Sequence, residues 1–173
     1  MPANLEIKAR LAETGKALIV AHSLPARYAG ELKQKDTYFS VENGRLKLRE
    51  ADNSIAELIF YRRVENSDRR RSNFCIYPAT DPKSLKAILK GAYGIRGVVE
   101  KKRSLFLYNG SRIHIDDVKG LGHFLEFEVP LNRTDGRKKI DFLTEVFNVR
   151  KEDYVRESYI DMILSGVRSE KGR

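Results

Sequence analysis

The stretch Asn4-Leu5-Glu6-Ile7-Lys8-Ala9-Arg10 alternates charged and apolar residues near the start of the chain. Phe124-Leu125-Glu126-Phe127-Glu128-Val129 alternates in the same way near the end. Successive side chains of a β-strand point to opposite faces, so each stretch is typical of a strand with one charged and one apolar face. Carboxylates and cations are concentrated in different segments of this kind.

The alternation recurs along the chain and predicts eight strands, at about 3–10, 36–42, 45–51, 54–63, 72–78, 96–108, 111–118 and 122–131. Many short antiparallel strands favour a closed or nearly closed sheet. The length of 173 residues favours a single domain spanning 1–173. We therefore expect one antiparallel sheet that closes on itself, with helices in the gaps between strands.

Periodicity does not say which face of these strands points inward. A charged face is commonly a solvated face. If the charged face instead points inward, an eight-stranded barrel has room for side chains or one small ligand. Basic side chains with a few carboxylates in such a lumen suit a polyanion with a bound metal. The alternation alone leaves both arrangements open.

Helices are expected in four places. Asp81-Pro82 has the character of a helix start, with Gly91 just past the end. The stretch 11–21 predicts a second helix. Two apolar stripes near the C-terminus, at 140–147 and 154–163, predict two more, followed by a polar tail at 165–173. We expect the run 69–71, three arginines, to lie in a solvated loop, and Cys75 to be a buried structural residue.

The formal charge of +9 and the pI near 9.7 predict attraction to polyanions. A single cysteine excludes an internal disulfide and fits a reducing compartment. We expect no signal peptide, because the chain becomes charged within a few residues of its start, and no apolar run approaches about 20 residues. We therefore expect a cytoplasmic protein without a membrane span.

Several kinds of chemistry are excluded. The chain has no Walker-type glycine-rich loop and no Gly-x-Ser-x-Gly elbow, and its three histidines lack the spacing of a zinc site. The acids that remain as candidates for oxygen ligation of Mg²⁺ or Mn²⁺ are Glu6, Asp116, Asp117, Glu126 and Glu128. The same acids are equally explained as ion-pair partners of the many lysines and arginines.

Several segments in order resemble the CYTH superfamily, which includes class IV adenylyl cyclases, thiamine triphosphatases and related triphosphate tunnel metalloenzymes. They are Glu6-Ile7-Lys8, Gln34-Lys35-Asp36-Thr37-Tyr38-Phe39, the run 44–50, the run 112–128 and Ser158-Tyr159. The run 112–128, with its His-Ile-Asp-Asp-Val and Leu-Gly-His-Phe-Leu-Glu-Phe-Glu, is most similar to the class IV adenylyl cyclase branch.

The resemblance implies an α+β fold, an eight-stranded antiparallel β-barrel tunnel with flanking helices, that binds a triphosphate and depends on Mg²⁺ or Mn²⁺. It implies that the charged face points inward. By position, the metal ligands would be Glu6, Asp116, Glu126 and Glu128, and the catalytic set Glu6, Lys8, Glu126 and Glu128. The triphosphate would be held by Lys8, Arg10, Lys47, Arg49, Arg63, Lys101, Arg103 and Arg112, with Tyr38 and Gln34 supporting the pocket.

One position departs from the family pattern Glu-x-Glu-x-Lys, because its first acid is Asn4 here. An amide accepts hydrogen bonds but brings no negative charge. This slightly disfavours a two-metal hydrolase.

The leading hypothesis is therefore a class IV adenylyl cyclase-like enzyme that converts ATP to cyclic AMP and pyrophosphate. An inorganic or thiamine triphosphatase with the same site is the alternative within the class. A non-catalytic binder of polyphosphate or RNA is the alternative of another class, with nucleic acid the less favoured ligand. The chain is expected to be a monomer or a homodimer.

Overall fold

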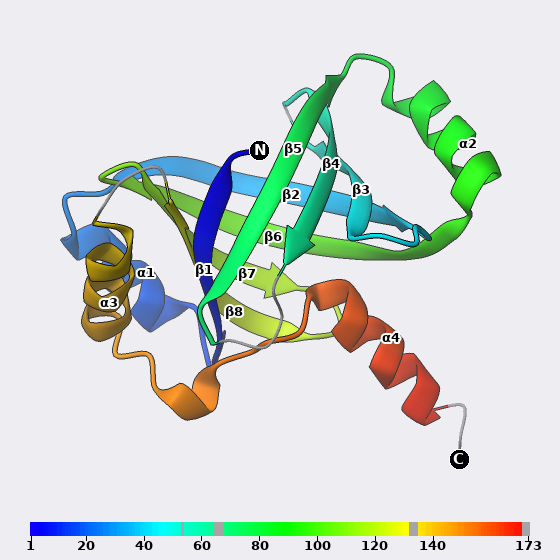
Figure 1. Ribbon diagram of the computed structural model, residues 1–173. Coiled ribbons are helices and arrows are strands. Elements are labelled where there is room, and N and C mark those ends of the chain that lie inside the picture. Colours follow the sequence, from blue (N-terminus) through cyan, green and yellow to red (C-terminus); the bar gives the residue numbers. More distant parts are fainter. Residues whose placement is uncertain (53, 64–67, 132–134, 171–173) are drawn as a thin grey trace.

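Eight strands form one closed antiparallel barrel in the computed structural model, which describes residues 1–52, 54–63, 68–131 and 135–170 (Figure 1). Around the barrel the strands follow the order β1-β5-β4-β3-β2-β6-β7-β8. Their bounds are β1 Ala3–Leu11, β2 Arg27–Phe39, β3 Arg45–Ala51, β4 Ala56–Arg63, β5 Arg70–Ala79, β6 Ile95–Tyr108, β7 Ser111–Val118 and β8 Gly122–Pro130. The expectation of an eight-stranded antiparallel barrel is confirmed.

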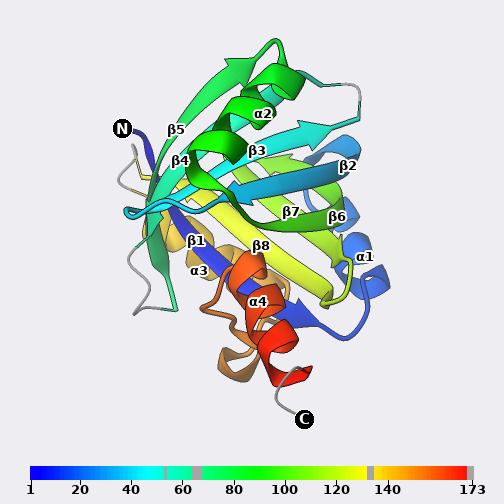
Figure 2. The ribbon, with the colours of Figure 1, turned by 90° about the vertical axis from the view of Figure 1, so that its right-hand side faces the viewer.

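The helices lie outside the barrel and at one end of it (Figures 1 and 2). They are α1 Gly15–Ser23, α2 Pro82–Tyr93, α3 Gly136–Val146, the short 3-10 helix η1 Lys151–Asp153, and α4 Tyr159–Glu170. None of the helices in the described part of the chain combines the length and apolarity needed to cross a membrane.

The apolar faces of the strands point outward and are covered by these helices. Ile7 of β1 and Phe127 of β8 belong to a buried cluster with Ala21 of α1 and Ile140 of α3. A second cluster joins α2 to the outer face of β2 and β3. The apolar faces of β1, β7 and β8 pack against α1 and α3, and those of β2 and β3 pack against α2. The charged faces of these strands therefore line the lumen, which answers the question that periodicity left open.

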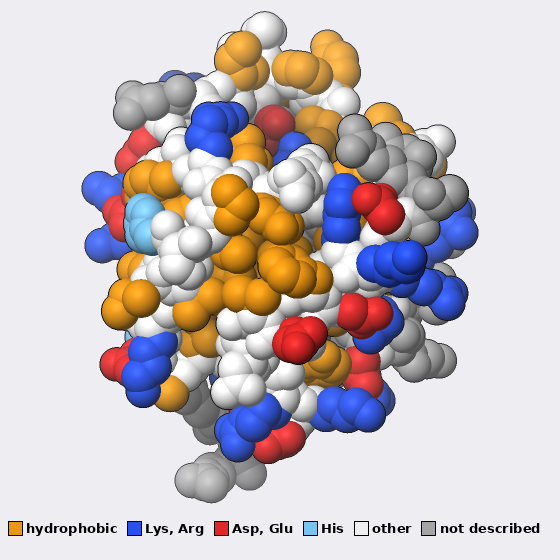
Figure 3. Space-filling model, turned by 90° about the vertical axis from the view of Figure 1, so that its left-hand side faces the viewer, with side chains coloured by type: hydrophobic (Ala, Val, Ile, Leu, Met, Phe, Trp, Pro, Cys, Tyr) orange, Lys and Arg blue, Asp and Glu red, His pale blue; other side chains and the backbone are white. Residues whose placement is uncertain are grey.

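One face of the molecule carries exposed apolar groups. Figure 3 shows hydrophobic side chains gathered near the centre of the side on which α1 and α3 lie. Large apolar residues that remain exposed on the elements of this side are Ile19 of α1, Tyr28 of β2 and Phe142 of α3.

Three helix expectations need correction. The segment that begins at Leu11 is not yet helical, because Leu11 still pairs with His123 in the ladder of β1 and β8. Helix α2 continues past Gly91 and ends at Gly94, whose φ of 71° allows its N–H to bond Lys90.

The last predicted helix also begins later than expected. Tyr154 forms an isolated bridge with Ala9, so α4 starts only at Tyr159. It then continues through the predicted polar tail as far as Glu170.

Strand β2 begins nine residues earlier than predicted, at Arg27, and pairs with β6 along its whole length. Its first half is largely exposed, so it lacks the clear contrast between apolar and polar faces that periodicity requires.

Candidate functional site

A small cavity of about 90 Å³ lies inside the barrel and is lined mainly by charged side chains. Every strand sends inward-facing residues toward this lumen. The cations are Lys8, Lys47, Arg49, Arg63, Arg70, Lys101 and Arg103, and the acids are Glu6, Asp36, Asp116, Glu126 and Glu128.

The register of three strands brings the acids of the C-terminal motif together. Lys8 of β1 pairs with Glu126 of β8, which pairs with His114 of β7. Two residues further along β8, Glu128 lies opposite Glu6 of β1 on one side and opposite Arg112 of β7 on the other. Side chains directly opposite in adjacent strands lie side by side, so the two glutamates form the centre of this patch.

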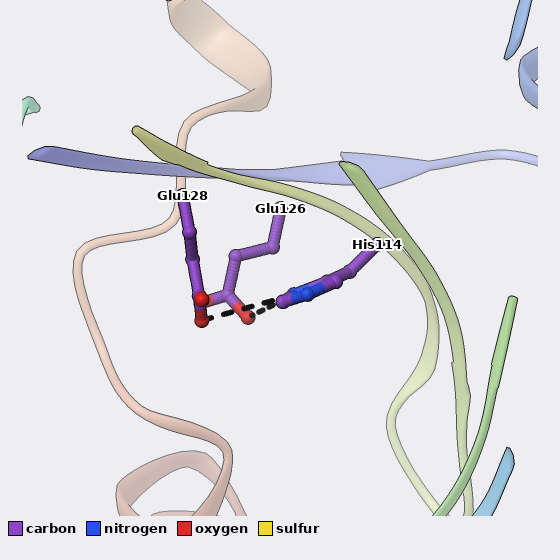
Figure 4. A group of neighbouring side chains, drawn as sticks. All are labelled: His114, Glu126 and Glu128. Carbon is purple, nitrogen blue, oxygen red and sulfur yellow. Dashed lines mark ion pairs between the residues drawn. The ribbon is translucent and has the colours of Figure 1, made fainter. Parts of the chain in front are cut away.

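Glu126, Glu128 and His114 point toward one another in the lumen (Figure 4). His114 Nδ1 lies 3.6 Å from Glu126 Oε2 and 3.8 Å from Glu128 Oε1. One donor atom from each of the three residues lies within 4.8 Å of the other two. Within the described part of the chain, this is the group of histidine, cysteine and acidic residues that is spaced to hold a cation.

Two atoms of this group that could ligate a metal ion are buried without a hydrogen bond, namely Nδ1 of His114 and Oε1 of Glu126. The nearest cations to that Glu126 oxygen are Lys8 Nζ at 3.7 Å and Arg63 Nη2 at 3.8 Å. Buried polar atoms in proteins are normally bonded. A cation bound between these residues would give both atoms a partner, so the residues present fit a divalent metal ion.

Glu6 and Asp116, the other predicted metal ligands, are held by arginines. Arg63 Nη2 lies 2.9 Å from Glu6 Oε2. Arg103 donates two hydrogen bonds, of 2.7 and 2.6 Å, to the two carboxylate oxygens of Asp116. Tyr159 adds a third bond to Asp116, at 2.9 Å. Asp116 therefore has no oxygen without a partner, whereas Glu126 has one.

Burial and the neighbouring charges shift the pKa of these acids in different directions. Burial raises the pKa of Glu6, and Arg63 only partly opposes it. Burial would also raise the pKa of Asp116, but Arg103 and Lys101 outweigh it and lower the pKa to about 2. Lys8 and the other nearby donors hold the pKa of Glu126 well below its usual range despite burial.

A second charge cluster on the opposite wall is organised by Asp36 of β2. Lys47 Nζ donates a hydrogen bond of 2.7 Å to Asp36, and Arg49 donates two, of 2.8 and 2.9 Å. Lys101 Nζ lies 3.7 Å away. Burial is the main reason that the pKa falls to about 7 for Lys47 and to about 8 for Lys101. The cluster presents three cations toward the lumen around one acid.

One end of the lumen is closed by the segment that leads into α4. Arg70 donates a hydrogen bond of 2.6 Å to the carbonyl of Arg156. Lys8 Nζ lies 3.5 Å from the carbonyl of Glu157 and 3.8 Å from the centre of the Tyr159 ring. These contacts tie the closing segment to residues of the site.

The structure brings almost all predicted site residues together. Gln34 and Tyr38 are buried, and the Tyr38 and Tyr61 hydroxyls are 3.4 Å apart. Arg112 lines the cavity at its edge, with its side chain 54% exposed and 3.5 Å from Glu128. Arg10 does not reach the lumen: it is exposed, and it packs over Phe124 and near the sulfur of Met162.

Arg70 was not predicted from the sequence as a site residue, and the expectation that residues 69–71 form a solvated loop was wrong, because β5 begins at Arg70. Arg70 is in β5 opposite Glu6 and only 1% exposed, because alternation in a strand turns the middle arginine inward while Arg71 stays outside. His114 was missed as a site residue, although it shares a strand face with Arg112 and Asp116. Asp36 was also missed, although it lies within the 34–39 segment that carried the family resemblance.

Cys75 is exposed and not buried as expected. It occupies the outward phase of β5, whose inward phase is that of Ser72, Phe74 and Ile76. The apolar neighbours that suggested burial therefore belong to the opposite face of the strand.

The fold and the lumen define a class of protein: a closed antiparallel barrel whose interior is lined by cations and carboxylates. Comparison with known proteins specifies the family. The family model of the CYTH domain matches residues 3–159. The chain belongs to the CYTH family.

Relatives agree along almost the whole chain. A Methanocaldococcus jannaschii protein named provisionally as an adenylate cyclase is 22% identical over 172 residues, covering 92% of this chain and 97% of that protein. A solved Pyrococcus horikoshii structure has a TM-score of 0.84 at 22% identity, covering 91% and 98% of the two chains. A provisionally named adenylyl cyclase from Hippeastrum, described as having a dominant triphosphatase activity, has a TM-score of 0.70 at 15% identity, covering 94% and 96%.

Proposed function

We propose that the protein is a divalent-metal-dependent enzyme that acts on a triphosphate, with ATP converted to cyclic AMP and pyrophosphate as its leading reaction. The observation that carries this proposal is the charge of the lumen. Among the described residues, seven buried or largely buried cations face five such carboxylates, a formal excess of two positive charges when all of them are ionised and Arg112 at the edge is not counted. A divalent ion brings the excess to four, which matches the roughly four negative charges of an ionised nucleoside triphosphate.

The residues on the two walls of the lumen would have different roles. Glu126 and Glu128 would hold the metal ion, with Glu6 beside them on β1. A bound divalent ion would neutralise phosphate charge and lower the pKa of an attacking hydroxyl or water. Lys47, Arg49 and Lys101 on the opposite wall would bind the phosphates.

The remaining cations link the two walls. Arg103 contacts both Asp116 and Glu126, and Arg63 contacts both Glu6 and Glu126, so each arginine joins two acids and would lie beside a phosphate bound next to them. In a cyclase, these cations would stabilise the pyrophosphate that leaves when the ribose 3′-hydroxyl attacks the α-phosphorus. Fixed charges in an enclosed site stabilise such developing charge without reorganisation.

A triphosphatase is the second candidate, because the same lumen would serve hydrolysis of a terminal phosphate. The dominant triphosphatase activity described for the Hippeastrum protein of the same fold supports triphosphate hydrolysis as the second candidate reaction. Inorganic triphosphate and thiamine triphosphate are the substrates to compare with ATP.

The test is to incubate the purified protein with Mg²⁺ or Mn²⁺ and each of these three triphosphates, and to resolve the products. Cyclic AMP with pyrophosphate supports the cyclase, and orthophosphate supports the triphosphatase. Glu128→Gln should lose turnover with either metal, while Glu13→Gln, an exposed acid outside the lumen, should keep it. Absence of product from all three substrates would refute the proposed function.

A further inference from the structure

We propose that His114 is a metal ligand and that its Nδ1, together with Glu126 and Glu128, makes the lumen site select Mn²⁺ over Mg²⁺. The inference rests on the proposed function for its metal dependence and adds a residue and a metal preference to it.

The spacing of the donors favours a cation between them over a direct imidazole–carboxylate bond. Nδ1 is 3.6 and 3.8 Å from the two carboxylate oxygens, beyond the usual limit of about 3.2 Å for an N–H···O bond. Donors around one ion at about 2.1 Å are separated by roughly 3.0 Å when adjacent and 4.2 Å when opposite. The two separations from Nδ1 lie between these values and all three ligand atoms lie within 4.8 Å of one another, so small side-chain shifts would bring them around one ion.

The surroundings hold these donors in place. His114 is 2% exposed, and its Nδ1 has no hydrogen-bond partner among the described residues. Arg103 Nη2 donates a bond of 3.1 Å to Oε2 of Glu126, the oxygen that lies 3.6 Å from Nδ1, and Oε1 of the same carboxylate has no hydrogen bond. Asp116 is the less favourable ligand, because it already accepts three hydrogen bonds from Arg103 and Tyr159.

A nitrogen ligand changes which ion the site prefers. Mg²⁺ and Mn²⁺ both favour oxygen ligands, but Mg²⁺ demands near-ideal octahedral geometry and gives up its waters reluctantly, whereas Mn²⁺ belongs to the first-row series of ions that also bind nitrogen ligands. Two carboxylates alone would leave the choice between Mg²⁺ and Mn²⁺ to the charge and size of the ion. The imidazole adds a donor that favours Mn²⁺.

Pulsed electron paramagnetic resonance of the wild-type protein loaded with less than one equivalent of Mn²⁺ tests the ligand directly. Coupling of the Mn²⁺ electron spin to ¹⁴N is expected, and it should change to a ¹⁵N pattern when histidine is labelled with ¹⁵N. The coupling should persist in the double variant His22→Gln/His123→Gln, which removes the two exposed or half-buried histidines. It should be lost in His114→Gln.

Affinity measurements test the preference. His114→Gln should weaken Mn²⁺ binding by about tenfold or more, the scale of loss at tuned metal sites, and Mg²⁺ binding by clearly less. An equal loss for both ions overturns the claimed preference. If the His114→Gln protein does not fold, the wild-type spectrum still decides whether histidine binds the ion.

The outcomes separate this inference from the proposed function. Turnover of a triphosphate with Mn²⁺ but no nitrogen coupling overturns the role of His114 and leaves the enzyme. Nitrogen coupling without turnover of any triphosphate supports the metal site and refutes the enzyme. Wild-type protein that binds no Mn²⁺ overturns the inference outright.

Discussion

Asp116 shows at the level of one residue how the lumen keeps charges that water would otherwise solvate. Its carboxylate is fully buried and is held by two hydrogen bonds from Arg103 and one from Tyr159. Removing one partner of such a pair leaves the other charge buried and unpaired, which costs far more than the pair contributes.

We therefore expect Asp116→Asn to lower the free energy of unfolding by about 3 kcal/mol, because Arg103 loses the charged partner that accepts two of its hydrogen bonds and keeps only its bond to Glu126. The matched control is Asp117→Asn, the same change at the next residue, which is exposed and should alter stability by no more than about 0.5 kcal/mol. Urea denaturation of both variants measures the difference. Equal stabilities would show that the Asp116–Arg103 pair is not a structural requirement.

The pKa of Lys47 leads to a prediction about how triphosphate affinity depends on pH. Burial lowers its pKa to about 7, so the lysine loses its proton in the free protein as the pH rises from about 6 to 8. Only the protonated form attracts phosphate, so affinity for inorganic triphosphate should weaken as the pH rises through this range. Bound phosphate favours the charged lysine, and binding at pH 8 should therefore take up protons.

Calorimetry in buffers of different ionisation enthalpy measures this proton uptake. Lys47→Arg keeps its charge at every pH tested and should take up roughly one proton fewer at pH 8. Lys16→Arg, an exposed position on α1, should behave as the wild type. An unchanged uptake in Lys47→Arg would assign the titration to other groups.

At the level of elements, the turn between β2 and β3 depends on Gly44. Its φ is +70°, and a Cβ built there would lie 2.8 Å from the carbonyl oxygen of Tyr61. Gly44→Ala should therefore destabilise the protein by more than about 1 kcal/mol. Gly15→Ala, at the start of α1 with no atom near its Cβ, should be neutral or stabilising. Thermal unfolding compares the two, and similar melting temperatures would contradict the assignment of strain to Gly44.

The strands were more predictable from the sequence than the helices. Each of the eight predicted strands overlaps an observed one, because burial of one face enforces a period of two. The boundaries around Leu11, Gly91 and Tyr154 were wrong because ladder pairing, a later glycine cap and an isolated bridge decide them. Those interactions join residues distant in sequence or depend on backbone angles that local patterns do not encode.

Much of the candidate site followed from the family resemblance, but its internal partners did not. Alternation predicted that Lys47 and Glu126 lie on charged strand faces, but it did not predict which residues of opposite charge they contact. That depends on the order of the strands around the barrel, which sets Lys8, Glu126 and His114 side by side. Arg70 lies in a run of three arginines that is typical of a loop. Its inward orientation follows only from the pairing of β5 with β1, in which Arg70 stands opposite Glu6.

The whole molecule separates two kinds of positive charge. The formal charge of the chain is +9, of which the lumen carries an excess of only two. Most of the excess therefore lies outside the lumen, where it attracts any polyanion and is screened by salt. RNA would contact this outer charge, whereas a small triphosphate would bind at the proposed site within the barrel.

Ligand-induced stabilisation distinguishes these two kinds of binding. Inorganic triphosphate with Mn²⁺ at about one hundred times Kd should add about 2.7 kcal/mol of stability, which raises the melting temperature by roughly 5–10 °C. Arg49→Gln, which removes a lumen cation bonded to Asp36, should lose most of this shift. Lys35→Gln removes an exposed cation from the outward face of β2 and should retain it.

A single-stranded RNA should show the opposite pattern. Its affinity should be unchanged by Arg49→Gln, and with about six phosphate contacts it should weaken roughly three-hundredfold between 50 and 200 mM salt. It should not reduce the thermal shift produced by triphosphate, because the two ligands occupy different surfaces. If RNA instead competes with triphosphate and loses affinity in Arg49→Gln, the lumen charges serve nucleic acid binding and the closed barrel is not a small-molecule site.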